Sequence, residues 1–222
     1  MLNNVNKQND LVHEFLRQAS LHTIEVDGHS IQLHVPDEHQ MQEAYKRNKI
    51  SFPYWSKLWP SALALSRFLL QHTNYIKGKN VVELGAGLGL PSIVAARYAK
   101  EILCTDHSPE AVAFAGLSAS HNQAHNFRTA VLDWNEMDVQ FDADTILLSD
   151  VNYDPAAFEN LLLQLRRFLN QGKNILLSTP QRLMAKEFLA ALLPYCRDSE
   201  TIPIMEKGTT TDISVFVLKN EE

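Results

Sequence analysis

The sequence predicts an α/β fold built on a doubly wound, mostly parallel sheet with an antiparallel strand at its C-terminal end. Short apolar runs rich in β-branched residues alternate with helical runs from residue 61 onward, as expected for parallel strands joined by right-handed crossovers. A glycine-rich turn, 85–89, follows the first of these strands. The last two strand-like runs, 197–204 and 211–218, have no helix between them and therefore predict an antiparallel pair.

The composition indicates a folded domain and excludes several classes of partner. The chain has 222 residues, of which 45% are hydrophobic, and a formal net charge of −6. Without a basic stretch, a nucleic-acid backbone is not expected as the main partner. Two cysteines form neither a disulfide framework nor a zinc pattern. With neither a secretion signal nor an 18-residue apolar run, we expect a soluble cytoplasmic protein that does not contact the membrane.

Residues 1–50 predict a helix followed by a hairpin. Apolar residues recur at helical spacing from Asp10 to Ser20, with Asp10 as the candidate N-cap. Two alternating runs then flank Asp27-Gly28, and an Asp-Gly pair in this setting predicts a tight β-hairpin. We interpret residues 1–50 as an accessory element beside a domain formed by residues 51–222.

The elements of that domain follow an aromatic stretch at 52–60. Strands are expected at 81–84, 101–105, 127–132, 145–148 and 174–178. Helices are expected to begin at Ser61, near Pro91, at Ser108-Pro109, at Asp154-Pro155 and at Thr179-Pro180, because proline is favoured in the first helical turn and serine, threonine and aspartate cap it.

The glycine turn predicts a nucleoside-cofactor site. Glycine can take a positive φ and lets a ligand approach the backbone without meeting a Cβ. Glu83 precedes the turn and is expected either to hold backbone amides or to reach the cofactor through water. Asp106 ends the next strand, 21 residues after Gly85, where an acid can bind both hydroxyls of a ribose. The dinucleotide fingerprint fails because its last position falls on Leu90, so a nicotinamide cofactor is the less favoured alternative.

Polar residues also follow the third and fourth strands, at the sheet edge where ligands bind in such folds. Asp133 can accept from an exocyclic amine and Trp134 can stack on a purine; the alternatives are a turn former and a core side chain. Asp150 and Tyr153 offer a carboxylate and a phenol that could orient an amine nucleophile at close range.

These motifs resemble those of a known enzyme family. Acid-x-Gly-x-Gly-x-Gly from Glu83 resembles motif I of the class I methyltransferases, which bind S-adenosylmethionine. With Trp59, Asp106, Asp133-Trp134 and Asp150-x-x-Tyr153, the chain resembles the seven-β-strand lysine methyltransferases of methyltransferase family 16. The resemblance implies a Rossmann-like, seven-stranded sheet and S-adenosylmethionine-dependent N-methylation, most readily of a protein lysine. The predicted cofactor-binding residues are Trp59, Glu83, Gly85, Ala86, Gly87, Gly89, Asp106, Asp133, Trp134 and Ser149, and the predicted catalytic residues are Asp150 and Tyr153.

Two other functions stay open: methylation of a small molecule, and cofactor binding without catalysis. A closed lid formed by residues 36–58 would favour a small molecule, whereas an open cleft with an aromatic rim would favour a protein. No metal site is expected, because His121 and His125 lie four residues apart without a third ligand at metal spacing. An Asn-Pro-Pro-Tyr motif is absent, which disfavours amide and nucleobase acceptors.

Overall fold

The structure, a computed structural model, describes residues 2–47, 49–135 and 142–221. Its larger sheet has seven strands in the order β5-β4-β3-β6-β7-β9-β8. Their bounds are β3 Asn80–Leu84, β4 Glu101–Asp106, β5 Phe127–Val131, β6 Thr145–Ser149, β7 Asn174–Pro180, β8 Cys196–Glu206 and β9 Thr209–Leu218. The first five in sequence are parallel, whereas β9 pairs antiparallel with β7 and with β8. The predicted sheet, with its antiparallel C-terminal strand, is confirmed.

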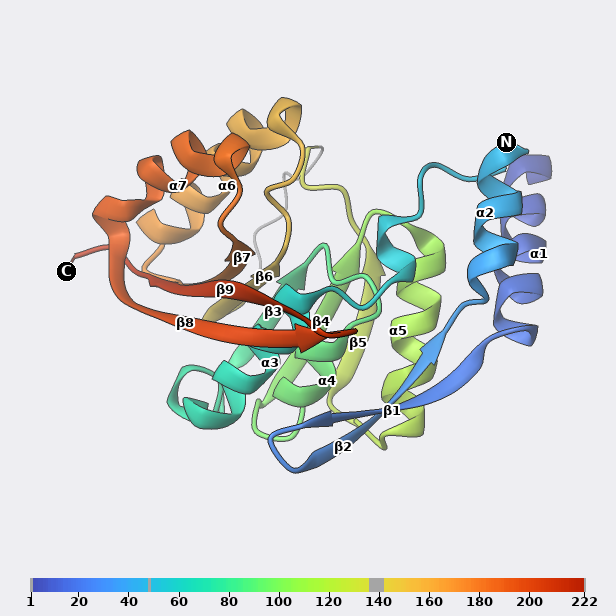
Figure 1. Cartoon of the computed structure of the whole chain (residues 1–222), viewed down its shortest axis with the longest axis horizontal. Helices are drawn as coiled ribbons and strands as arrows, with labels where there is room; N and C mark the ends of the chain where they lie inside the picture. The colour runs from blue at the N-terminus through green and yellow to red at the C-terminus, as the bar shows by residue number, and fades with distance from the viewer. Residues whose placement is uncertain (1, 48, 136–141, 222) are drawn as a thin grey trace.

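Helices cover both faces of this sheet, because neighbouring residues of a strand point to opposite sides. Val81 and Leu147 are buried with helices α3 (Pro60–Gln71), α4 (Leu90–Ala95) and α5 (Pro109–His121). Val82 and Leu148 are buried with α6 (Phe158–Asn170) and α7 (Lys186–Leu192). Figure 1 shows α6 and α7 grouped together, away from α3, α4 and α5. The sheet is therefore buried on both faces, as apolar parallel strands require.

The N-terminal residues form α1 (Leu2–Arg17), β1 (Ser20–Val26), β2 (His29–Val35) and α2 (Glu38–Lys46). The hairpin predicted at Asp27-Gly28 is confirmed: φ is 45° at Asp27 and 79° at Gly28, as a type I′ turn requires. The first helix begins at Leu2 rather than at Asp10, so the predicted cap at Asp10 is wrong. Helix propagation is cooperative, and the helix therefore extends past the apolar pattern that predicted it.

Helix α2 was not predicted. Asp37 caps it, because its side chain accepts a hydrogen bond of 2.8 Å from the amide of Gln40. Met41 of α2 is buried in one cluster with Phe15 of α1 and Phe114 of α5, and Figure 1 shows α1 and α2 next to each other. Trp55 joins this cluster, with its ring centroid 5.4 Å from that of Phe114, so this tryptophan packs in the core.

The β1–β2 hairpin is held on α5 by hydrogen bonds between the main chain of β2 and two side chains, those of Ser118 in α5 and of Asn122 at its end. Asn122, which caps the C-terminal end of α5, accepts from the amide of Gln32 at 3.0 Å and donates to its carbonyl at 2.6 Å. The amide of His34 donates to the hydroxyl of Ser118 at 2.9 Å. Ile31 is fully buried in the same cluster as residues of α3 and α4. The hairpin therefore closes the core on this side of the sheet.

Two later helices begin after the positions predicted for them. Asp154 accepts from the amide of Ala156 at 3.0 Å, but it caps a 3₁₀ turn, Pro155–Ala157, that leads into α6. The helix predicted at Thr179-Pro180 is wrong there, because β7 continues through Pro180, which lies opposite Ile213 of β9. Pairing with β9 keeps these residues extended, and a proline is tolerated at the end of a strand. None of the described helices is long and apolar enough to cross a membrane.

Replacement of Asn122 by alanine should weaken the attachment of the hairpin to α5. The change removes both side-chain bonds to Gln32 in a partly buried position, and we expect a loss of about 1–3 kcal/mol in the free energy of unfolding. Urea denaturation followed by circular dichroism measures it. Ser120→Ala on the exposed face of α5 is the control and should stay within about 0.5 kcal/mol. Equal midpoints for both variants would contradict this view of the hairpin.

Candidate active site

The strand order brings two polar loops together at one edge of the sheet. From β3 the chain runs outward through β4 to β5, and it then returns to β6 on the other side of β3. The end of β3 is thus paired with the end of β6, with Leu84 opposite Leu148. Gly85 and Ser149 leave the sheet next to each other. Such a reversal of strand order creates a crevice beyond the carboxyl ends of the strands.

A cleft lies at this reversal, and most of the predicted residues line it. Those that do are Trp59, Gly85, Ala86, Gly87, Gly89, Asp106, Trp134, Ser149, Asp150 and Tyr153. Tyr54 and His107, which were not predicted, also line the cleft. Tyr54 lies in the aromatic stretch that also contains Trp59, and His107 directly follows Asp106.

The three glycines of the turn serve different packing needs, although all have positive φ (65°, 54° and 76°). A Cβ on Gly85 would lie 2.8 Å from the ring of Trp134. A Cβ on Gly87 would lie 3.3 Å from the carbonyl oxygen of Trp55. A Cβ on Gly89 would lie 2.9 Å from that of Ala115 in α5. Gly89 therefore lets α4 approach α5, while Gly85 lets the ring of Trp134 pack directly against the turn.

Asp106 holds the glycine turn in place. Its Oδ2 accepts from the amide of Gly87 and its Oδ1 from the amide of Ser108, each at 2.9 Å. The side chain is buried at the cleft wall. Nδ1 of His107 lies 3.3 Å from Oδ1, and the hydrogen bond with Asp106 raises the pKa of His107. Each carboxylate oxygen can accept two hydrogen bonds, so Oδ2 has capacity for a ligand hydroxyl.

Glu83 lies behind the glycine turn. It is completely buried, and its Oε2 accepts from the amide of Ser92 at 3.0 Å and from the hydroxyl of Ser92 at 2.5 Å. Its Oε1 has no hydrogen-bond partner in the described structure. Burial raises the pKa of Glu83 to about 8, so the carboxyl is largely protonated at neutral pH. Of the two roles left open by the sequence, this geometry favours holding a backbone amide, at the first turn of α4.

Asp133 and Trp134 take separate positions after β5. Oδ1 of Asp133 accepts from the amide and the side-chain amide of Asn135, at 2.8 and 2.9 Å, which matches the turn-forming alternative. Asp133 is exposed, outside the described wall of the cleft. Trp134 is half-buried against Gly85, and its indole N–H is buried without a partner among the described residues. An unpaired buried donor in a cleft wall can serve a ligand.

Asp150 follows β6 in a left-handed conformation with φ of 57°. Its amide donates to the carbonyl of Ser178 in β7 at 2.9 Å, which fixes the turn. Its carboxylate, buried in the cleft, accepts two hydrogen bonds from Arg182, one from Nη1 to Oδ1 and one from Nη2 to Oδ2. Arg182 was missed in the sequence. The signal for it was its place two residues after β7, at the same edge of the sheet.

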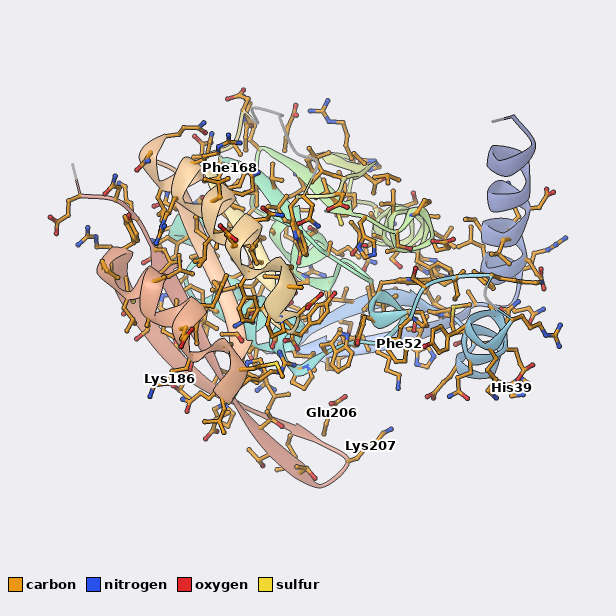
Figure 2. The ribbon with its side chains drawn as sticks, turned by 90° about the horizontal axis from the view of Figure 1, so that it is seen from above. His39, Phe52, Phe168, Lys186, Glu206 and Lys207 are labelled. Atoms are coloured by element: carbon orange, nitrogen blue, oxygen red, sulfur yellow. The ribbon has the colours of Figure 1, made fainter. Side chains whose placement is uncertain are left out.

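Tyr153 connects the cleft to an aromatic rim. It is half-buried, and burial raises its pKa, so the phenol stays protonated at neutral pH. Its ring lies 4.8 Å from that of Tyr54, which lies 4.5 Å from Phe52, which in turn lies 5.3 Å from Tyr45 of α2. Figure 2 shows Phe52 on the loop between α2 and the sheet domain. Tyr45, Phe52 and Tyr54 are exposed, so these three residues form an aromatic rim with an outward face.

Three features of the cleft fit a nucleoside cofactor. They are a glycine turn that lines the cleft, a carboxylate with acceptor capacity on Asp106, and an indole N–H on Trp134 that has no partner among the described residues. The free volume, about 60 Å³, is room for roughly two water molecules. The cleft also opens to solvent, and the space between its walls is about 610 Å³ when that opening is included. The described residues contain no group of three side chains that could hold a metal ion, and the ring of His121 lies against that of His34 at 5.6 Å.

Comparison with known proteins finds methyltransferases. A family model described as lysine methyltransferase matches residues 30–193. "Protein N-lysine methyltransferase METTL21A" of Danio rerio is 35% identical over 173 residues, 74% of this chain and 77% of that protein. "Histone-arginine methyltransferase METTL23" of Homo sapiens is 27% identical, over 66% of this chain and 80% of that protein. "Electron transfer flavoprotein beta subunit lysine methyltransferase" of Mus musculus is 36% identical over 60% of this chain, which spans only 52% of its length.

Solved structures share the fold at low sequence identity. The 16S rRNA methyltransferase RsmC of T. thermophilus, in complex with AdoMet and guanosine, has a TM-score of 0.64 at 14% identity, over 92% of this chain and 51% of that one. SMU.776, a putative methyltransferase complexed with SAH, has a TM-score of 0.60 at 15% identity, over 90% and 56%. These similarities confirm the Rossmann-like sheet.

Glu83 should make stability depend on pH in a defined direction. Its pKa is about 8 in the folded protein and about 4.3 in an unfolded chain, so folding favours the protonated form. The stabilisation is complete below about pH 4 and is lost as pH rises through about 8. Glu83→Gln imitates the protonated carboxyl and removes this dependence.

The measurement is the free energy of unfolding of both proteins from about pH 5 to about pH 9. We expect the wild type to lose about 1 kcal/mol or more relative to Glu83→Gln over that range. Parallel curves for the two proteins would show that Glu83 ionises normally inside the fold. Glu187→Gln on α7 is the control, because that side chain is exposed.

Proposed function

The chain belongs to the lysine methyltransferase family and is an S-adenosylmethionine-dependent methyltransferase; from that premise we propose that its acceptor is the side-chain amine of a protein lysine. One observation supports the proposal above all: Asp150 and Tyr153 line the same cleft as the glycine turn and Asp106. A site for the cofactor and a site for an amine thus adjoin. If the two sites were apart, binding of the cofactor would not lead to methyl transfer.

A protein acceptor is supported by the outer surface of the cleft. Tyr45, Phe52 and Tyr54 expose an aromatic rim beside Tyr153, and exposed aromatic side chains are common in protein interfaces. The relatives METTL21A and the flavoprotein lysine methyltransferase are named for protein lysines. A protein arginine is the second candidate, because the relative METTL23 is named for histone arginine and Asp150 already binds a guanidinium.

The cofactor would be held by residues that the fold fixes before it arrives. The glycine turn offers its backbone, Asp106 its free acceptor capacity to the ribose hydroxyls, and Trp134 its ring to the adenine. Ser149 lies beside them at the end of β6. The bound cofactor supplies an electrophilic methyl group on a sulfonium.

The protein's task is then to present a neutral amine along one axis. A free lysine has a pKa of about 10.4 and arrives protonated. The Asp150 carboxylate can accept an N–H of the arriving amine, and the protonated Tyr153 can accept a second through its phenol oxygen. The lysine binds as an ammonium, and partial burial of the site promotes loss of its proton, which leaves to water at the open side of the cleft. Fixed orientation supplies most of the expected acceleration.

Asp106→Asn should weaken binding of S-adenosylhomocysteine, measured by isothermal titration calorimetry. The amide loses the charge that strengthens hydrogen bonds to the ribose hydroxyls, and we expect about a tenfold or greater rise in Kd. Asp133→Asn is the matched control and should bind as the wild type does, because its carboxylate caps a turn outside the cleft wall. An equal loss in Asp133→Asn would restore the alternative in which Asp133 holds the adenine.

Asp150→Asn and Tyr153→Phe should lose methyl transfer while keeping cofactor affinity. We expect turnover to fall about a hundredfold for Asp150→Asn and about tenfold for Tyr153→Phe, which loses one hydrogen bond. The assay follows tritium from labelled S-adenosylmethionine into protein extract of cells that lack this gene, and mass spectrometry distinguishes methyl-lysine from methyl-arginine. Full turnover in both variants would exclude Asp150 and Tyr153 from positioning the acceptor.

A further inference from the structure

The carboxylate that the proposed reaction needs is already paired within the chain. Arg182 donates from Nη1 and Nη2 to the two oxygens of Asp150. The Asp150 side chain is 8% exposed, and that of Arg182 is 30% exposed. Two parallel bonds between a guanidinium and a carboxylate form the strongest of the common ion-pair geometries. An incoming amine must therefore compete with Arg182 for Asp150.

Arg182 lies where an acceptor side chain could come in from outside. A groove of about 490 Å³ runs from Asp150 past Arg182 and Trp59 to Glu206 and Lys207. Figure 2 shows Glu206 and Lys207 at the tip of the β8–β9 hairpin, which extends from the body of the protein. The guanidinium thus stands between the buried carboxylate and the solvent, in the position of a substrate cation.

We propose that Arg182 is an internal latch on the acceptor site: it occupies Asp150 in the resting protein and is displaced by the cationic side chain of the acceptor. This inference rests on the proposed function, since it concerns the same carboxylate. Arg182 acts through Asp150 and is a positioning residue rather than a catalytic one.

The latch gives the site a preference for cations. A neutral alcohol or amide offers no charge to replace the guanidinium, so Arg182 stays paired with Asp150 when such a molecule arrives. A lysine ammonium replaces the ion pair of Arg182 with Asp150 by its own ion pair with Asp150. The free energies of the two pairs nearly cancel, and the released Arg182 is hydrated again in the groove. The guanidinium stays charged at every working pH, so acceptor binding, and not protonation of Arg182, opens the latch.

The latch can be tested by binding alone, with n-butylammonium chloride as a mimic of the lysine side chain. Wild type, Arg182→Gln, Arg182→Lys and Arg197→Gln are saturated with S-adenosylhomocysteine and titrated while the indole N–H signal of Trp59, in the cleft wall, is followed by NMR. Arg197 is the matched control, because it pairs with Glu221 at 2.9 Å outside the cleft. Titration with n-butanol, the neutral analogue, gives the effect of the alkyl chain.

Without the competing guanidinium, Arg182→Gln should bind n-butylammonium about tenfold more tightly than the wild type. Arg182→Lys, which keeps the charge without the two parallel bonds, should fall between them, and Arg197→Gln should equal the wild type. Equal or weaker binding by Arg182→Gln would overturn the latch and make Arg182 a structural support of Asp150. The proposal would also be overturned if n-butanol shifted the Trp59 signal as much as n-butylammonium does.

A second readout reports the position of Arg182 itself. Its side-chain Nε–H signal, identified by its loss in Arg182→Lys, should move on addition of n-butylammonium toward its position in Asp150→Asn. A signal that stays in place while Trp59 responds would overturn the displacement. Neither readout involves methyl transfer. A wild type that passes both tests but methylates no protein in the extract would contradict the proposed function and not the cation site.

Discussion

The carboxylate and carbonyl of Asp106 connect the three segments that form the cofactor side of the cleft. The side chain accepts from the amide of Gly87 in the glycine turn and from that of Ser108 at the start of α5. Its carbonyl accepts from the amide of Leu132 at 2.8 Å, just before Trp134. The turn after β3, the first turn of α5 and the loop after β5 are thus fixed relative to one residue at the end of β4. A charged acceptor strengthens such bonds, and burial protects them from water.

Behind this wall, a second buried acid performs a different task. Burial raises the pKa of Glu83 to about 8, and its side chain holds the first turn of α4 through Ser92. Asp106, at the cleft, accepts from two backbone amides instead. Glu83 therefore supports the helix that follows the glycine turn, while Asp106 faces the ligand.

The acceptor side depends on a strained turn and an internal cation. Asp150 has a φ of 57°, a conformation that is uncommon for residues other than glycine, and its amide is tied to β7 through Ser178. Such strain is frequent at functional sites, where the surrounding structure fixes it. Arg182, from the end of β7, satisfies the buried charge that this turn exposes to the cleft. The same carboxylate is thereby kept in place and kept from neutral molecules.

The sheet, the glycine turn and the residues at the strand ends could be predicted because each follows from a local pattern in the sequence. Apolar runs specify buried parallel strands, Asp27-Gly28 specifies a hairpin, and Gly85, Asp106, Asp150 and Tyr153 follow their strands directly. Tertiary structure decided what depended on partners distant in sequence. Pairing with β9 kept Thr179-Pro180 extended where a helix was predicted, and Asp133 used its carboxylate on its own turn. Arg182 became part of the site because β6 and β7 are neighbours in the sheet and β7 extends to Pro180, so that Arg182 follows a strand end and does not lie in the helix predicted there.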